Sequence, residues 1–328
     1  MKIINKALKL QGTLDMMGYG MYVLKAKYWE QRSLRSKMVE DFLNKNYPKY
    51  KFSRTNFKQN VKLYEKNYRK SAKTYILNNK IANILNIEKL EDNNYYLKCN
   101  KENAKTMLYV YGSGFWQEIS NFQWYFLRTL ADNLEVNIIV LNQKFAPYYD
   151  YYQVIEDLDN LYKDYKSKIN YVAADGSGAT LLYNLLNNQE DVSNIDKMIL
   201  FSPIINLDFD TTIINKEDPV IDSYSLKVQT EYFFNKDYEK AMLHSPYHMK
   251  LKDMPDTIII SGGKDTLNKD IINFYNKQVY YKKDIELWNY DHMIHNFQFF
   301  PLSETKEVLN KLCDVFNSNI QKPLETKE

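Results

Sequence analysis

Short apolar runs and longer amphipathic stretches alternate through the middle and C-terminal parts of the chain. The apolar runs predict strands at 107–111, 136–141, 171–174, 197–201 and 257–260, and the last strand is expected at 284–288. Helical spacing predicts helices at 122–133, 153–165, 269–280 and 304–316, and another helix that begins at Thr180. This alternation predicts an α/β fold with a mostly parallel central sheet flanked by helices.

The rest of the pattern divides the chain further. Residues 1–82 show helical spacing at 16–28, 34–43 and 60–77 without strand or turn signals, which predicts an N-terminal helical arm or cap. The main domain is expected over 83–316, with two short strands between 81 and 100. Within it, the polar stretch 206–250 is expected to be a cap insertion, helical around 223–234. Residues 317–328 form a polar tail.

Composition narrows the class of protein. With 45% hydrophobic and 26% charged residues, the chain has the make-up of a soluble globular protein. The net charge is only +3 and the basic residues look scattered, which argues against a nucleic-acid partner. Cys99 and Cys313 lie far apart, so neither a disulfide framework nor a metal site is expected. No stretch resembles a secretory signal or a membrane span, which predicts a cytoplasmic protein and leaves room for peripheral membrane contact.

Glycine is scarce, and six of the nine glycines fall in three pairs. The pairs are at 112 and 114, at 176 and 178, and at 262 and 263, each directly after an apolar run. Glycine is needed where the backbone takes positive φ or approaches a ligand closely. The pairs therefore predict turns at one edge of the sheet, where open α/β folds build their sites.

The central pair has the setting of a nucleophile elbow, in which a strained turn between strand and helix exposes a serine. The usual pattern there is Gly-x-Ser-x-Gly. Residues 174–178 read Ala-Asp-Gly-Ser-Gly, so Gly176 stands at the centre and Ser177 follows one place later. Most of the functional question reduces to this difference of one residue.

Two later residues complete a possible triad with Ser177. Asp265 follows the third glycine pair, and His295 lies in the loop after the last expected strand. Nucleophile, acid and histidine then occur in the order found in α/β-hydrolases. A serine must lose its proton to the imidazole as it attacks, and the carboxylate orients the imidazole.

The first glycine pair is the candidate oxyanion hole. Backbone N–H groups of Gly112, Ser113 and Gly114, with Gly178 beside the elbow, would stabilise the charge of a tetrahedral intermediate. No lysine of the P-loop type follows the turn, so a phosphate-binding loop fits poorly.

Together these motifs resemble the hormone-sensitive-lipase-like group of bacterial esterases and lipases in the α/β-hydrolase superfamily, over about residues 105–316. The matching stretches are Tyr111–Phe115 with His-Gly-Gly-Gly-Phe, Lys144–Pro147 with Arg-Leu-Ala-Pro, Ala174–Ala179 with Gly-Asp-Ser-Ala-Gly-Gly, Phe201–Pro203 and Ser245–Pro246 with two Ser-Pro exits, Gly262–Asp265 with the acid loop, and Met293–Phe297 with Met-Pro-His-x-Phe. The resemblance implies an α/β-hydrolase fold with a helical cap, and acyl-enzyme hydrolysis of a short acyl or acetyl ester. The implied partner is a small-molecule ester or acyl ligand, with no metal and no cofactor.

The same alignment raises a second hypothesis. Without a gap, Gly176 falls where the family has its nucleophile, and Tyr111 and Ser113 alter the oxyanion loop. If Ser177 were the nucleophile instead, Asp175 and Ala179 would occupy positions that require small residues. The sequence therefore leaves two functions open: a carboxylic-ester hydrolase that uses Ser177, Asp265 and His295, and an inactive pseudo-hydrolase with a binding or scaffold role. It sets no oligomeric state.

Overall fold

The computed structural model describes residues 22–46, 76–91, 93–146, 148–210, 215 and 217–318. Residues 16–21 and 60–75 of the expected N-terminal helices, and the tail from 319 on, lie outside the described residues. No helix in the described ranges is long and apolar enough to cross a membrane.

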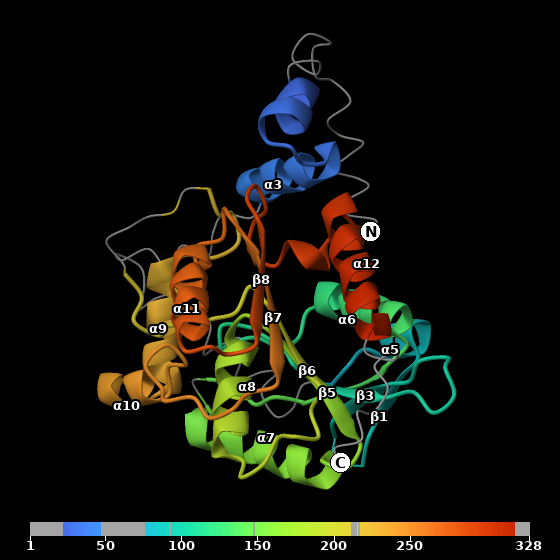
Figure 1. Cartoon of the computed structure of the whole chain (residues 1–328), viewed down its shortest axis with the longest axis vertical. Coiled ribbons are helices and arrows are strands. Elements are labelled where there is room, and N and C mark those ends of the chain that lie inside the picture. The colour runs from blue at the N-terminus through green and yellow to red at the C-terminus, as the bar shows by residue number, and fades with distance from the viewer. Residues whose placement is uncertain are drawn as a thin grey trace, which may run out of the picture.

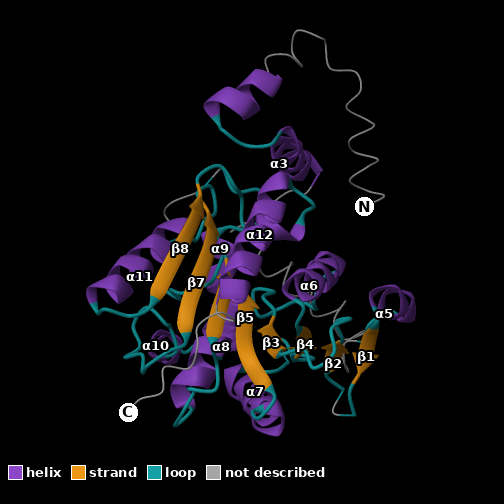
Figure 2. Ribbon diagram, turned by 45° about the vertical axis from the view of Figure 1, so that its right-hand side comes forward, coloured by secondary structure: helices purple, strands orange, loops and turns teal. Residues whose placement is uncertain are grey.

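The described part of the chain folds around an eight-stranded sheet in the order β1-β2-β4-β3-β5-β6-β7-β8 (Figure 2). The strands are β1 Ile87–Lys89, β2 Tyr95–Leu97, β3 Thr106–Val110, β4 Asn137–Val140, β5 Ile169–Asp175, β6 Lys197–Phe201, β7 Asp256–Gly262 and β8 Ile285–Tyr290. β2 pairs antiparallel with β1 and with β4, and the remaining neighbours pair parallel. The predicted mostly parallel sheet is confirmed.

Helices cover both faces of this sheet (Figure 1). The helices are α3 Leu34–Asn46, α5 Asn79–Leu85, α6 Asn121–Leu134, α7 Tyr151–Tyr165, α8 Ser177–Asn188, α9 Ser223–Phe233, α10 Tyr238–Leu243, α11 Asn268–Tyr280 and α12 Ser303–Ser318. One hydrophobic cluster joins α7, α8 and α11 to one face of the sheet, and a second joins α6 and α12 to the other. The inner strands β3, β5, β6 and β7 are buried on both faces and read as nearly continuous apolar runs, whereas the edge strand β8 is partly exposed and alternates.

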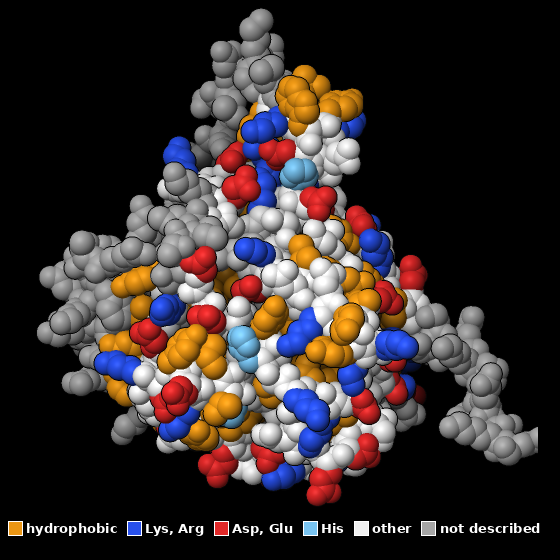
Figure 3. All heavy atoms as spheres, turned by 60° about the vertical axis from the view of Figure 1, so that its left-hand side comes forward, with side chains coloured by type: hydrophobic (Ala, Val, Ile, Leu, Met, Phe, Trp, Pro, Cys, Tyr) orange, Lys and Arg blue, Asp and Glu red, His pale blue; other side chains and the backbone are white. Residues whose placement is uncertain are grey.

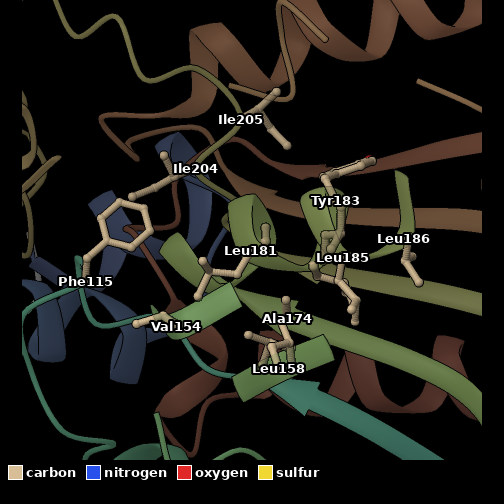
Figure 4. Packing of buried hydrophobic residues seen from close by; sticks show 14 of the residues in the cluster. Phe115, Val154, Leu158, Ala174, Leu181, Tyr183, Leu185, Leu186, Ile204 and Ile205 are labelled. Carbon is tan, nitrogen blue, oxygen red and sulfur yellow. The ribbon is translucent and has the colours of Figure 1, made fainter. Parts of the chain in front are cut away.

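β5 and α8 lie at the centre of the first cluster. All ten residues from Ser177 to Leu186 are buried. Figure 4 shows Leu181 and Leu185 of α8 close to Ala174 of β5 and to Leu158 of α7. A helix packed on all sides cannot shift easily, so it holds its first residue in a fixed place at the end of β5.

Two details of the expected fold are wrong. The helix after β5 begins at Ser177 and not at Thr180. The region expected to hold only two short strands also contains α5, whose first turn is capped by the Asn78 side chain bonded to the Lys80 N–H at 2.8 Å. An Asn cap of this kind satisfies an N–H group that the helix itself leaves unpaired.

The described part of the N-terminal arm rests on loops that leave the sheet. It consists of helical residues 22–24, a π-helical turn over Lys25–Trp29, and α3. Lys264 donates to Glu40 at 2.9 and 3.0 Å, and Arg32 donates to the carbonyl oxygen of His292 at 3.1 Å. These contacts fix α3 beside the loops that follow β7 and β8 (Figure 1).

Candidate active site

Gly176 occupies the tip of the turn between β5 and α8. Its backbone angles are φ 46° and ψ −123°, a conformation that glycine adopts readily and other residues adopt at a cost. A Cβ added at this position would meet nothing closer than the Gly112 Cα at 3.6 Å, and it would lie 3.9 Å from Nε2 of His295. The tip therefore has room for a side chain directed at the histidine, and the glycine supplies none.

Ser177 is the first residue of α8 and is completely buried. Its Oγ accepts hydrogen bonds from the backbone N–H of Ser113 at 3.0 Å and of Phe115 at 3.3 Å. In the described part of the chain, no hydrogen bond joins Ser177 to His295. The serine hydroxyl thus faces the loop that was expected to form the oxyanion hole.

The predicted acid and base meet as expected from their order in the chain. Nδ1 of His295 lies 3.0 Å from Oδ2 of Asp265, whose Oδ1 accepts from the Leu267 N–H at 2.9 Å. On the other side of the ring, Nε2 of His295 lies 3.0 Å from Nδ2 of Asn296. Burial opposes a charged imidazole, but the nearby carboxylates, Asp265 foremost, outweigh it and raise the pKa of His295.

Asp175, just before the tip, lies in a buried polar network. It accepts from the Tyr109 hydroxyl at 2.7 Å and from Nε2 of Gln123 at 3.1 Å. Burial raises the pKa of its carboxyl to about 6, although these hydrogen bonds act in the opposite direction. Gln123 also donates to the Gly112 carbonyl oxygen at 2.7 Å, so one side chain links α6, the elbow and the oxyanion loop.

The other glycines are held by close backbone packing. A Cβ at Gly178 would fall 2.0 Å from the Val110 carbonyl oxygen, so only glycine fits where α8 crosses the end of β3. Gly112 and Gly114 lie in the loop that follows β3, on either side of Ser113, whose N–H contacts Ser177. The structure thus brings the expected oxyanion residues together with Ser177, and Asp265 together with His295.

The cap helix α9 lies over the oxyanion loop. Oε1 of Gln229 would be 2.2 Å from a Cβ at Gly114, and the Trp116 indole donates to the Gln229 carbonyl oxygen at 3.0 Å. The rings of Phe115 and Phe233 stack with their centroids 4.4 Å apart. Gly176 is buried and His295 is only 7% exposed, so little of the site faces solvent.

Hydrogen bonds connect the segment before α9 to the loop that carries Asp265. Oδ2 of Asp218 accepts from the Thr266 N–H at 2.8 Å, and the Thr266 hydroxyl donates to the Ile221 carbonyl oxygen at 3.2 Å. Burial, followed by repulsion from Asp265, raises the pKa of Asp218 to about 6. The charged groups facing His295 are therefore mainly carboxylates. Among the described residues, no group of three or more His, Cys, Asp or Glu is placed to hold a metal ion.

With this geometry in place, sequence comparison decides the family. A family model described as alpha/beta hydrolase fold matches residues 107–299, more than half of the chain. The chain belongs to the α/β-hydrolase fold family. The match spans the sheet from β3, the elbow and the loops that carry Asp265 and His295, so the predicted family and fold are confirmed.

Individual esterases are also similar to this chain in sequence or in structure. An esterase of Acinetobacter venetianus is 22% identical over 242 residues, which cover 68% of this chain and 78% of the esterase. The structure of a candidate esterase from Staphylococcus aureus superposes with a TM-score of 0.70 at 19% identity, covering 81% of this chain and 94% of that one. An esterase of the bacterial hormone-sensitive lipase family gives a TM-score of 0.62 at 19% identity, covering 77% and 95%. At this level of identity, the similar structures establish the shared α/β-hydrolase fold.

Several residues of the site were not anticipated. Asn296, beside the histidine, contacts Nε2, and Gln123, Asp218 and Gln229 connect the elbow, the acid loop and the cap helix. Of these, only Asn296 carried a signal in the sequence, because it directly follows the expected base. The other three are single polar residues in helices and loops, and only the folded chain brings them near the elbow.

Proposed function

We propose that this chain is an α/β-hydrolase that has lost acyl-enzyme turnover and keeps a small-molecule binding role. The observation that carries the proposal is Gly176 at the tip of the elbow, with φ 46° and ψ −123°. The tip is where the fold presents its nucleophile to the histidine. Glycine has no atom that could attack a carbonyl carbon.

The position of Ser177 supports the same conclusion. To act as a nucleophile, its hydroxyl would have to reach Nε2 of His295 and give up its proton there. Instead, it accepts from two backbone N–H groups, those of Ser113 and Phe115. Turning the hydroxyl away would leave the buried Phe115 N–H without an acceptor, at a cost of about 1–3 kcal/mol, and would also unpair the half-buried Ser113 N–H.

The groups that a substrate would contact are already occupied within the protein. Ser177 Oγ takes the position at which the Ser113 N–H would meet a substrate oxygen. Asn296 contacts Nε2 of His295, and the Gln229 side chain covers Gly114. An acyl or ester ligand would therefore have to displace these internal contacts. We propose a small acyl or ester compound as the ligand class, because the oxyanion-loop N–H groups match a carbonyl oxygen and the apolar rings of Phe115 and Phe233 match an acyl chain.

The competing function is a serine esterase that uses Ser177, Asp265 and His295. The retained pair of Asp265 and His295, 3.0 Å apart, is what favours it. It requires a different position of the Ser177 side chain, reached when a ligand displaces the internal contacts. Both functions predict binding of an ester, and they differ in turnover.

Hydrolysis of p-nitrophenyl acetate and butyrate separates the two functions. The wild-type chain, Ser177→Ala and His295→Ala are compared at equal concentration, since a buried histidine alone can hydrolyse activated esters slowly. We expect wild type and Ser177→Ala to be equally slow. Wild-type turnover that falls by about 1000-fold or more in Ser177→Ala would overturn the proposal and establish the esterase.

A further inference from the structure

The charge of this chain is divided sharply between its N-terminal part and the rest. Residues 1–75 contain 18 of the 44 Lys and Arg residues but only 5 of the 41 Asp and Glu residues, a formal charge of +13. Residues 76–328 hold the remaining 26 basic and 36 acidic residues, a formal charge of −10. The interpretation of the basic residues as scattered is therefore wrong, because the total of +3 conceals the division.

The outermost described part of this basic region exposes large apolar side chains. Leu24 is 48% exposed, Tyr28 65% and Trp29 71%, and the side chains of Lys25 and Lys27 between them are exposed too. We call residues 24–29 the arm tip. Figure 3 shows hydrophobic side chains with a neighbouring basic group at this outer end of the arm. An exposed cluster of this kind on a single turn favours a function in contact with another surface.

The base of the arm, in contrast, is fixed. Glu40 pairs with Lys264 and Arg32, and Arg35 donates to the Pro301 carbonyl oxygen at 2.9 Å. The Ser33 hydroxyl donates to Glu304 at 2.8 Å. The arm tip is therefore held away from the sheet, on the side of the loops that follow β7 and β8 (Figures 1 and 2).

From this arrangement we propose that the arm tip docks the protein on an anionic lipid bilayer. Trp and Tyr side chains are favoured at the level of lipid headgroups, and Leu reaches the acyl boundary below them. Lys27 and Lys25, which stays 56% exposed in its 3.7 Å pair with Glu30, match the negative headgroups, and each basic residue near such a surface strengthens binding about fivefold. The acidic remainder of the chain is repelled by the same surface, so the protein binds with its arm toward the bilayer.

The apolar part of the arm tip favours lipid over nucleic acid. Binding to phosphate backbones uses basic side chains and needs no exposed leucine. At the base of the arm, moreover, Arg32 and Lys264 are already paired with the carboxylate of Glu40 and are not available to phosphates. A bilayer on the arm tip would lie on the side of the sheet that carries the Asp265 and His295 loops.

Flotation with phospholipid vesicles tests this proposal without reference to ester turnover. The full chain is mixed with vesicles of phosphatidylcholine alone or with phosphatidylglycerol added. Two arm-tip variants are compared, Leu24→Ala with Tyr28→Ala and Trp29→Ala, and Lys25→Glu with Lys27→Glu. The matched control is Tyr280→Ala with Tyr281→Ala, which removes side chains that are 82% and 58% exposed on and just after α11.

We expect binding to the vesicles with phosphatidylglycerol, weakening with salt, and at least a tenfold loss in both arm-tip variants but not in the control. Because the arm-tip side chains are exposed, circular dichroism should show all variants folded. Equal binding to phosphatidylcholine alone, or unchanged binding by both arm-tip variants, would overturn the proposal. So would duplex DNA that displaces the vesicles and binds the arm-tip variants as tightly as the wild type, since the basic region would then serve a nucleic acid.

Discussion

A side chain at Gly176 would point at His295. The Cβ position at Gly176 lies 3.9 Å from Nε2 of the histidine, and the nearest atom outside the adjoining residues 175 and 177 is the Gly112 Cα at 3.6 Å. A serine hydroxyl placed there would come within hydrogen-bonding reach of a base that Asp265 already orients. The site thus keeps His295 and Asp265 in contact beside an elbow whose tip has no side chain.

The Ser177 hydroxyl should contribute to stability rather than to turnover. Ser177→Ala removes the acceptor of the Ser113 and Phe115 N–H groups, so we expect the free energy of unfolding to fall by about 1–3 kcal/mol. Urea unfolding measures the change. Ser113→Ala is the control, because the Ser113 hydroxyl is buried without a hydrogen-bond partner among the described residues, and its removal should cost nothing. Equal effects of the two substitutions would contradict the assigned role of Ser177.

The buried carboxyl of Asp175 should make stability depend on pH. Its pKa is raised from 3.8 to about 6 in the folded chain, so the folded state binds more protons than the unfolded state between these values. Its contribution is fully present below pH 3.8 and is lost as the pH rises through 6. The free energy of unfolding of Asp175→Asn, measured in urea between pH 4.5 and about 7.5, should therefore decline less than that of the wild type. The decline that remains comes from Asp218, whose pKa is also raised to about 6.

An exposed carboxyl provides the control for this pH effect. The hydrogen bond from Lys283 lowers the pKa of Asp253, so any contribution of this group has the opposite sign. Asp253→Asn should leave the wild-type decline near pH 6 in place. If Asp175→Asn shows the same decline as the wild type, Asp175 is not the group that titrates there.

Glu40 should hold the arm on the domain. Its carboxylate pairs with Lys264 and Arg32, and its side chain is only 10% exposed. Glu40→Gln removes the negative charge that pairs with these two largely buried cations. We therefore expect the free energy of unfolding to fall by about 3 kcal/mol. Glu307→Gln breaks the exposed pair with Lys311 and should change the unfolding free energy by no more than about 0.5 kcal/mol. A Glu40 effect as small as the Glu307 effect would mean that the ion pairs do not hold the arm.

The centre of the sheet could be predicted from the sequence because its inner strands are buried on both faces. Runs such as 198–201 and 258–260 are apolar throughout, and they fall within β6 and β7. The sequence pattern predicts the start of α8 three residues too late, at Thr180, because Ser177, Gly178 and Ala179 have the composition of a turn. Close packing against β3 requires glycine at 178, so tertiary contact overrides the low helix propensity of Gly178.

The site could be predicted only in part. The order of the elbow, Asp265 and His295 in the chain was enough to expect the last two to meet, because strand ends gather at one edge of the sheet. The direction of the Ser177 hydroxyl could not be inferred, since it depends on N–H groups more than 60 residues away in the sequence. The charged arm could have been recognised by counting charges in segments instead of over the whole chain.

Covalent labelling with a fluorophosphonate, followed by intact mass, tests the central claim most directly. The wild type, Gly176→Ser and Gly176→Ala are compared. Both substitutions carry the strain of a side chain at φ 46°, about 1–3 kcal/mol, so Gly176→Ala is the control for folding. We predict labelling of Gly176→Ser alone, at residue 176 and dependent on His295. Labelling of the wild-type chain at Ser177 would contradict the account.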